Sequence, residues 1–319
     1  MTWDGRHLLD VESLDVREVE RILSLASEFR LDEGRASFAD GTLRGSNLAL
    51  LFAEPSTRTR LSFELAARKL GAETYLLEPP ASSMVKGETL ADTVRNLDAI
   101  GFDFLVVRHH RSGAPWVAAR YFAGHVVNAG DGWHAHPTQA LLDLFTLTRA
   151  LGDMRGRKIA IVGDVLHSRV ARSNVWTLTQ AGADVSLCGP TQWLRGLESL
   201  PVTLTSELDA ALLDADAVMG LRVQKERMAA GVSLDEYFER YRITESRLAR
   251  SAPGARYLHP GPINEGVEVT RDVARGPRSL VLEQARNGVP VRMAVLAILK
   301  GPAPTASHPE SATYVGTRG

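Results

Sequence analysis

The chain of 319 residues is long enough for two domains of about 150 residues each, and with 44% hydrophobic and 24% charged residues it has the composition of a globular protein. With 37 basic and 38 acidic residues the formal net charge is −1, which excludes an overall electrostatic attraction to nucleic acid or an anionic membrane. The single Cys188 excludes an internal disulfide and a cysteine-built metal cluster. No run approaches the roughly 18 apolar residues of a membrane span, so we expect a soluble protein of the reducing cytoplasm.

The first half of the sequence alternates apolar runs with helical patterns. Helical spacing of apolar residues predicts an amphipathic helix within 11–30, with Ser13 or Asp15 as its N-cap. A second helix is expected over 58–71, where Gly71 ends it. Buried strands are expected at the apolar runs 46–53, 102–108 and 124–130. This alternation is typical of a parallel sheet covered by helices on both faces.

The second half repeats this organisation after a long apolar helix over 136–152, a candidate connection between two lobes that Gly152 ends. A second parallel sheet is expected from the runs 158–164, 183–190, 215–223 and 255–262. A final apolar helix over 287–299 is placed to pack back on the first lobe. The tail that follows is rich in Pro, Ser, Thr and Gly, and we expect it to be poorly ordered.

The predicted fold class is therefore α/β, with two doubly wound parallel-sheet domains joined by interdomain helices. The expected boundaries are 1–135 for the first domain, completed by a C-terminal helix at 285–300, then 136–284 for the second domain and 301–319 for a flexible tail. Two such lobes have a cleft between them, and open α/β sheets bind ligands at the carboxyl ends of their strands.

The run EPSTRTR, residues 54–60, follows the first predicted strand and begins a helix. The backbone amides of 56–59 lie near a helix N-terminus, where unpaired donors and the helix dipole favour an anion. Arg58 adds a planar donor suited to phosphate or carboxylate. The same residues also suit a Ser/Thr N-cap with solvated arginines, so these observations leave two interpretations open. The run is unlike a P-loop, because no Gly-Lys-Ser/Thr follows a glycine-rich turn.

Two other kinds of site are considered and set aside. The strand ending in Gly163 resembles the start of a dinucleotide-binding unit, but the chain continues DVLHSR and the G-x-G-x-x-G spacing fails. His134 and His136 suggest a metal pair, but two histidines two residues apart without a carboxylate-rich set make a poor metal site. We therefore expect no metal and no cofactor.

Seven segments resemble, in order, the motifs of the aspartate and ornithine carbamoyltransferase family. They are FAEPSTRTRLSFELAARKLGAE (52–73), SSMVKGETLADT (82–93), VVRHH (106–110), NAGDGWHAHPTQALLDL (128–144), VGDVLHSRVARSN (162–174), RVQKER (222–227) and LHPGP (258–262). Glu54, RVQKER and HPGP look like the aspartate-specific members, whereas ornithine-specific members usually carry Lys at the first position and HCLP late in the chain. The alternatives are an enzyme specific for ornithine or another amino acid, and an inactive scaffolding homologue.

The resemblance implies that the α-amine of L-aspartate attacks carbamoyl phosphate, giving N-carbamoyl-L-aspartate and phosphate early in pyrimidine synthesis. This chemistry calls for positioning and charge stabilisation and needs neither a metal nor a covalent nucleophile. By resemblance, Arg108 reaches the phosphate and the carbamoyl oxygen, His136 and Thr59 polarise that oxygen, and Gln139 accepts a hydrogen bond from the carbamoyl NH2 group. The expected carbamoyl-phosphate site is Ser56, Thr57, Arg58, Thr59, Arg108, His136, Gln139, Gly261 and Pro262.

The aspartate side of the site is expected mainly from the second lobe. By resemblance, Arg169 binds the α-carboxylate, while Arg222 and Gln224 bind the side-chain carboxylate. Glu54 would orient Arg169 through a salt bridge once the lobes close.

In the family, a loop from the neighbouring subunit of a trimer completes the site. The matching residues here are Ser82 and Lys86, so the resemblance implies a homotrimer with shared active sites. A dihydroorotase-like partner or regulatory chains are possible further components of the assembly. Neither nucleic acid nor membrane is an expected partner.

Two departures from the family pattern stand out. Glu265 occupies a position where Arg is common, and we expect its carboxylate to point away from the site or to meet a nearby arginine. Trp133 and His134 replace smaller or polar residues, which could alter packing at the cleft.

Overall fold

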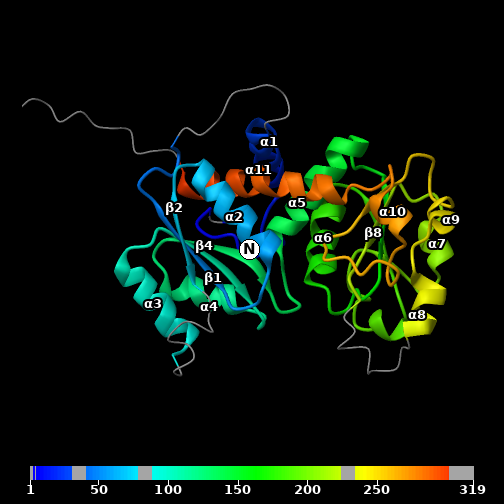
Figure 1. Cartoon of the computed structure of the whole chain (residues 1–319), viewed down its shortest axis with the longest axis horizontal. Coiled ribbons are helices and arrows are strands. Elements are labelled where there is room, and N and C mark those ends of the chain that lie inside the picture. Colours follow the sequence, from blue (N-terminus) through cyan, green and yellow to red (C-terminus); the bar gives the residue numbers. More distant parts are fainter. Residues whose placement is uncertain (1–2, 4, 31–40, 78–87, 224–233, 302–319) are drawn as a thin grey trace, which may run out of the picture.

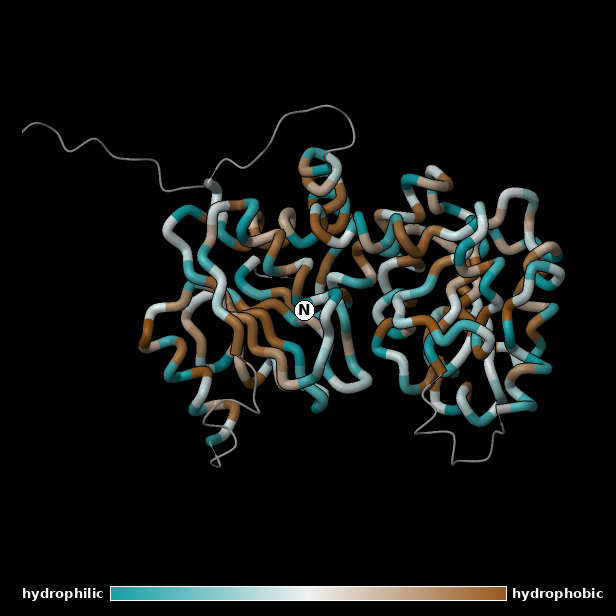
Figure 2. Tube along the Cα trace, in the orientation of Figure 1, coloured by the Kyte–Doolittle hydropathy of each residue, from teal (hydrophilic) through white to brown (hydrophobic). Residues whose placement is uncertain are grey.

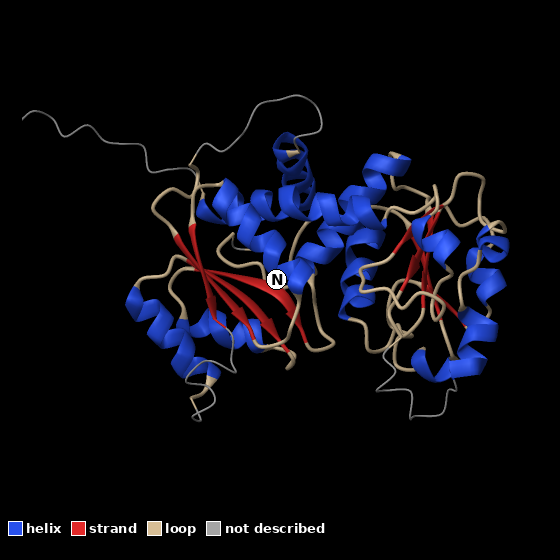
Figure 3. Cartoon of the chain, viewed as in Figure 1, coloured by secondary structure: helices blue, strands red, loops and turns tan. Residues whose placement is uncertain are grey.

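The computed structural model describes residues 3, 5–30, 41–77, 88–223 and 234–301. Figure 1 shows two α/β lobes side by side, with helices α5 and α11 running across the boundary between them. Figure 3 shows each sheet with helices on both of its faces, as the alternating sequence pattern predicts.

The first lobe contains a parallel sheet in the order β2-β1-β3-β4. Its elements are α1 (Val16–Phe29), β1 (Asn47–Phe52), α2 (Thr57–Lys69), β2 (Glu73–Leu77), α3 (Leu90–Ile100), β3 (Phe104–His109), α4 (Ala114–Tyr121) and β4 (His125–Asp131). All three predicted strands are confirmed, and each is buried along nearly its whole length, as its apolar run predicts. Of the two predicted N-caps of α1, Ser13 and Asp15, the structure has Asp15, which forms a capping box with Glu18.

The second lobe contains a parallel sheet in the order β7-β6-β5-β8-β9. Its elements are β5 (Lys158–Val162), α6 (Arg169–Gln180), β6 (Asp184–Cys188), a 3-10 turn (Thr191–Trp193), β7 (Thr203–Thr205), α7 (Leu208–Leu212), β8 (Ala217–Gly220), α8 (Leu234–Tyr241), α9 (Glu245–Leu248), β9 (Arg256–Leu258) and α10 (Arg271–Arg275). The four predicted strands are confirmed. The short edge strand β7 was not expected from the sequence.

Helices α5 (Pro137–Leu151) and α11 (Val281–Lys300) connect the lobes. Helix α11 packs on α1, α2 and α5, which confirms that the final helix returns to the first lobe. One buried apolar cluster extends from β1 and α2 through α5 and α11 to β5 and α6, and Figure 2 shows apolar residues concentrated along these elements. Within the described ranges, no helix is both long enough and apolar enough to cross a membrane.

Candidate active site

The run EPSTRTR connects the carboxyl end of β1 to the beginning of α2. Ser56 is the N-cap of α2, but its side chain makes no capping hydrogen bond. Ser56 therefore occupies the predicted N-cap position, but its hydroxyl does not cap the helix. Thr59, in the first turn, is buried. The amides of this turn lie at the positive end of a 13-residue helix, where unpaired N–H groups and the helix dipole favour an anion.

The guanidinium of Arg58 lies against the HPGP segment of the second lobe. A Cβ placed on Gly261 would lie 2.0 Å from each of the two Nη atoms of Arg58, so a glycine is required for this approach. Gly261 also has a φ of +67°, which favours glycine, and the peptide bond to Pro262 is cis. Two motifs about 200 residues apart in the sequence thus meet at one place, and burial lowers the pKa of Arg58.

Glu54 joins an arginine from each lobe. Arg108, in β3, donates from Nη2 to Glu54 Oε1 at 2.6 Å and from Nη1 to the Ala129 carbonyl at 3.1 Å. Arg169, the first residue of α6, donates from Nη1 to Glu54 Oε2 at 3.0 Å and from Nη2 to Oε1. The expected Glu54–Arg169 salt bridge is present, whereas the contact of Glu54 with Arg108 was not expected.

The charges in this cluster shift one another's pKa. Burial by itself would raise the pKa of Glu54, but the hydrogen bonds and charges of Arg169 and Arg108 outweigh it, and the pKa is lowered. Burial, followed by repulsion from Arg169, lowers the pKa of Arg108 to about 10, although Glu54 opposes the shift. Arg108 is therefore cationic and Glu54 is anionic near neutral pH.

Gly130, near the end of β4, makes room for both guanidinium groups. Its φ is +114°, and a Cβ at this position would lie 2.9 Å from Arg108 Nη1 and 3.0 Å from Arg169 Nε. Sequence reasoning assigned no role to this residue. The signal was present in the motif NAGDGW, but a glycine there does not reveal which side chains come close to it.

His136 and Gln139 stand at the beginning of α5. His136 is the N-cap of α5 and is buried. Its backbone N–H donates to Ser173 Oγ at 3.0 Å. The Nδ1 atom of its ring has no hydrogen-bond partner among the described residues. Burial, followed by the charges of Arg108 and Arg169, holds the pKa of His136 well below its usual range, so the imidazole is neutral. Gln139 is buried rather than exposed, and its Nε2 donates to Asp143 Oδ1 at 2.9 Å.

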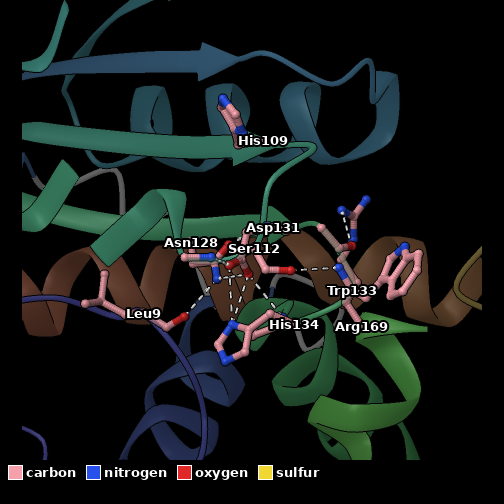
Figure 4. Close-up of polar contacts among 12 residues, drawn as sticks. Leu9, His109, Ser112, Asn128, Asp131, Trp133, His134 and Arg169 are labelled. Atoms are coloured by element: carbon pink, nitrogen blue, oxygen red, sulfur yellow. Dashed lines mark hydrogen bonds and ion pairs between the residues drawn. The ribbon is translucent and has the colours of Figure 1, made fainter. Parts of the chain in front are cut away.

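The His134 side chain points toward Asp131, as Figure 4 shows. Its Nδ1 lies 3.3 Å from a carboxylate oxygen of Asp131, and this contact raises the pKa of His134. The same carboxylate oxygen accepts a hydrogen bond from the backbone N–H of Gly113 at 2.7 Å. The edge of the His134 ring packs on Trp116. In the part of the chain that the structure describes, no group of three His, Cys, Asp or Glu residues is arranged to hold a metal ion.

The structure shows the contacts of Glu265 and Trp133, which depart from the family pattern. Glu265 accepts a hydrogen bond from Arg275 Nε at 2.7 Å, which confirms the expected arginine partner. Trp133 is 47% exposed and packs edge-on against the His167 ring, with 4.5 Å between ring centroids. The backbone N–H of Trp133 donates to Ser112 Oγ at 3.2 Å, and Figure 4 shows the residue at the surface near Arg169.

Four other residues predicted for the site are Arg222, Ser82, Lys86 and Gln224, and the structure describes only the first of them. Arg222 is exposed at the carboxyl end of β8, two residues after the strand. Ser82, Lys86 and Gln224 lie outside the described residues. A surface hollow of about 600 Å³ lies beyond the end of β3, where it is lined by 88–91, 109–114 and Val117. Its lining includes neither Arg108 nor Arg169.

Comparisons with known proteins agree with this geometry. Residues 6–149 match the family model described as aspartate/ornithine carbamoyltransferase, carbamoyl-P binding domain, and residues 155–299 match the Asp/Orn binding domain of the same family. The aspartate carbamoyltransferase catalytic subunit of Roseiflexus sp. (strain RS-1) is 53% identical over 304 residues, which cover 93% of this chain and 95% of the relative. That of Chloroflexus aurantiacus (strain ATCC 29366 / DSM 635 / J-10-fl) is 47% identical over 308 residues, 94% of this chain and 100% of the relative.

Solved structures give the same result. Aspartate transcarbamoylase from Trypanosoma cruzi, in complex with carbamoyl aspartate and phosphate, is similar with a TM-score of 0.78 and 30% identity, covering 92% of this chain and 96% of that one. Ornithine carbamoyltransferase from Pyrococcus furiosus is similar with a TM-score of 0.82 and 28% identity, covering 95% and 100% of the two chains.

Proposed function

The chain belongs to the aspartate/ornithine carbamoyltransferase family, and from this membership we propose that it transfers the carbamoyl group of carbamoyl phosphate to the amine of L-aspartate. It is an enzyme, and its reaction yields N-carbamoyl-L-aspartate and phosphate, the committed early step of pyrimidine synthesis. The single observation that carries the proposal is Glu54, which draws Arg108 and Arg169 together beside the N-terminus of α2.

The first lobe, completed by α11, is proposed to bind carbamoyl phosphate. The phosphate lies at the N-terminus of α2, where the amides and hydroxyls of 56–59 and the guanidinium of Arg58 donate to its oxygens. Arg108 and Thr59 stabilise negative charge on the carbamoyl oxygen, and neutral His136 contributes a polar group without adding charge. Gln139 accepts from the carbamoyl NH2 group through Oε1, because its Nε2 is engaged by Asp143.

The second lobe is proposed to bind L-aspartate. Arg169 takes the α-carboxylate, and Arg222 with Gln224 takes the side-chain carboxylate. The amine nitrogen then forms a bond to the carbamoyl carbon, the carbon–oxygen bond to phosphate breaks, and the amine loses a proton. Guanidinium groups on this side attract the two carboxylates of aspartate and repel the ammonium group of ornithine, which favours the aspartate reaction.

The assay that tests this function offers aspartate and ornithine side by side with carbamoyl phosphate. We expect carbamoylated product from aspartate and little or none from ornithine. Comparable or faster product formation from ornithine would refute the assignment of the amine substrate.

The phosphate site is tested separately by Arg58→Ala. Loss of a charge contact made in the transition state lowers turnover by about 10²–10³-fold. Arg68→Ala, on the last turn of the same helix, is the matched control, because Arg68 is exposed and pairs with Glu64 at 2.9 Å. Near-normal turnover by Arg58→Ala would show that the phosphate lies elsewhere.

The proposed assembly is a homotrimer in the cytoplasm, with Ser82 and Lys86 of each subunit completing the site of a neighbour. Mixed inactive subunits carrying Lys86→Ala or Arg58→Ala then recover some activity, because a hybrid trimer contains a site with neither substitution. No recovery after verified subunit exchange would place Lys86 in the site of its own chain. Further assembly with a dihydroorotase-like partner or regulatory chains remains a prediction from the resemblance.

A further inference from the structure

A buried carboxylate lies directly behind the proposed carbamoyl site. Asp143, on α5, is fully buried and accepts hydrogen bonds from three side-chain amides. Its Oδ1 accepts from Gln139 Nε2 at 2.9 Å and from Gln284 Nε2 at 2.7 Å, and its Oδ2 accepts from Asn174 Nδ2 at 2.9 Å. The three donors belong to α5, α11 and α6, so one carboxylate ties together the helices that border both lobes.

This arrangement determines which way each glutamine amide faces. An ionised carboxylate can only accept hydrogen bonds, so both glutamines must turn their NH2 groups toward Asp143 and their oxygens away from it. The Oε1 of Gln284 accepts from the backbone N–H of His259 at 2.9 Å, and His259 Nδ1 accepts from the N–H of Gly261 at 2.8 Å. A chain of hydrogen bonds therefore leads from Asp143 to the HPGP segment.

The charged neighbour of Asp143 is Arg292, which is buried on α11. Its Nη1 donates to the Gly288 carbonyl at 2.9 Å, and its guanidinium lies over the Phe63 ring, 4.9 Å from the centroid. Burial raises the pKa of Asp143 to about 6, although the three amide hydrogen bonds and the charge of Arg292 oppose the rise. Asp143 is thus ionised, and restricted to accepting, near neutral pH.

We propose that Asp143 is a positioning residue that determines how the enzyme recognises the NH2 group of carbamoyl phosphate. We take the acceptors of that NH2 to be Gln139 Oε1 and the backbone carbonyls of 260–262, in the HPGP segment that meets Arg58. Gln139 donates to Asp143 Oδ1 directly, and the 260–262 segment is connected to the same oxygen through His259 and Gln284. The inference rests on the proposed function. Beyond that function, the inference states that Asp143, behind the site, controls the enzyme's preference for carbamoyl phosphate over an acyl phosphate of the same shape.

Acetyl phosphate is the probe, because a methyl group replaces the NH2 of carbamoyl phosphate and cannot donate a hydrogen bond. The measured quantity is the ratio of the inhibition constant of acetyl phosphate to the KM of carbamoyl phosphate, determined on the full chain at pH 8. Inorganic phosphate serves as a second inhibitor that reports on the phosphate contacts alone. Turnover of aspartate by the unsubstituted enzyme tests the proposed function independently, and its absence would remove the premise.

Asp143→Leu keeps a similar shape and removes every acceptor. We expect the preference for carbamoyl phosphate over acetyl phosphate to fall about tenfold, the effect of losing one well-placed hydrogen bond, with inhibition by inorganic phosphate changed less than threefold. Gln284→Leu breaks the connection to His259, and we expect it to lower the preference by a smaller factor. If Asp143→Leu does not fold, the preference of Gln284→Leu tests the proposal in its place. An unchanged preference in the folded variants would overturn the proposal.

Asp143→Asn separates the acceptor atom from the charge. An asparagine can keep its oxygen toward both glutamines by turning its NH2 toward Asn174. The Asn174 amide must then flip, so that its Oδ1, which has no hydrogen-bond partner among the described residues, accepts from the introduced NH2 group and its Nδ2 gives up the hydrogen bond to the Val170 carbonyl. We therefore expect this variant to keep the preference within threefold of the unsubstituted enzyme. A loss as large as that of Asp143→Leu would overturn the acceptor role in favour of a role for charge.

Thr146→Val is the matched structural control. Thr146 lies one turn further along α5, is buried, and accepts from Asn287 Nδ2 at 2.8 Å, so this pair joins the same two helices α5 and α11. The substitution is expected to lower the midpoint of urea denaturation and to leave the preference unchanged. An equal loss of preference in Thr146→Val would show that any weakening of this helix pair has the same effect.

Discussion

Replacing Gly130 by alanine tests whether the pairing of Arg108 and Arg169 around Glu54 depends on the absence of a side chain at one backbone position. The new Cβ would lie 2.9 Å from Arg108 Nη1 and between 3.0 and 3.2 Å from the Nε and Cζ atoms of Arg169. Contacts this short require the two guanidinium groups to move. They cannot swing freely, because Arg108 is also bonded to the Ala129 carbonyl and Arg169 to the Gly132 carbonyl.

The expected magnitude has two parts. Holding a residue other than glycine at a φ of +114° destabilises the fold by about 1–3 kcal/mol. Displacing the guanidinium groups moves the charges that are proposed to face the carbamoyl oxygen and the aspartate carboxylate. Since a misplacement of about 1 Å lowers rates about 10²-fold, and the shift needed here is smaller, we expect kcat/KM to fall about 10- to 100-fold.

The assay is steady-state formation of carbamoyl aspartate, together with urea denaturation of each variant. Gly152→Ala is the matched control: Gly152 ends α5 with a φ of +78°, and a Cβ there meets no atom of the described residues within 4 Å. It should lose stability without losing activity. The reasoning is refuted if Gly130→Ala retains kcat/KM within twofold of the unsubstituted enzyme, or if Gly152→Ala loses as much activity.

Three further predictions concern the same region and its surface. Glu54→Gln leaves two guanidinium groups facing a neutral amide, so we expect at least a tenfold loss of kcat/KM and a loss of about 1–3 kcal/mol in the free energy of unfolding, measured by turnover and urea denaturation. Because the pKa of buried His136 lies well below its ordinary value of 6.5, its contribution to stability is present above pH 6.5 and is lost as the pH falls through the lowered pKa. Urea denaturation of His136→Gln should therefore show a shallower decline of stability below pH 6.5, and an unchanged decline would contradict this assignment. Glu265→Ala breaks an exposed pair with Arg275, and we expect a change in unfolding free energy of at most about 0.5–1 kcal/mol and normal turnover; a large effect on turnover would place Glu265 in the site.

The apolar runs revealed the strands that are mostly buried, including the edge strands β4 and β9, and missed the more exposed edge strands β2 and β7. Central strands such as β1 are buried on both faces, so apolar runs reveal them, whereas β2 is mostly exposed or half-buried and carries no such run. The edge strand β7 has three residues, none of them fully buried. Helix α11 begins at Val281, six residues before its apolar pattern becomes clear, because its first turns carry exposed charged residues such as Arg286.

The site was predictable where a residue's chemistry is visible in its own motif. Arginines, His136 and Gln139 could be predicted from the motifs that contain them, whereas the proposed roles of Gly130 and Asp143 depend on side chains that the fold brings from other elements. The contact between Glu54 and Arg108 depends on strand register, because Phe52 in β1 pairs with Arg108 in β3 and Glu54 follows two residues later. Such a register requires knowing which strands are neighbours, and the motifs do not provide it.

The ion pair between Glu54 and Arg169 also explains how the two lobes can hold a site between them. On the side of α5 and α11 the lobes share one apolar cluster, which is packed and does not open readily. At the site, the lobes are joined by charges whose partners are partly exposed, with 29% of the Glu54 side chain and 14% of the Arg169 side chain accessible. Anionic substrates can compete for such guanidinium groups, because a carboxylate or phosphate offers them the same hydrogen bonds as Glu54. We therefore expect substrate binding to be coupled to the link between the lobes, so that substitutions of Glu54 alter both together.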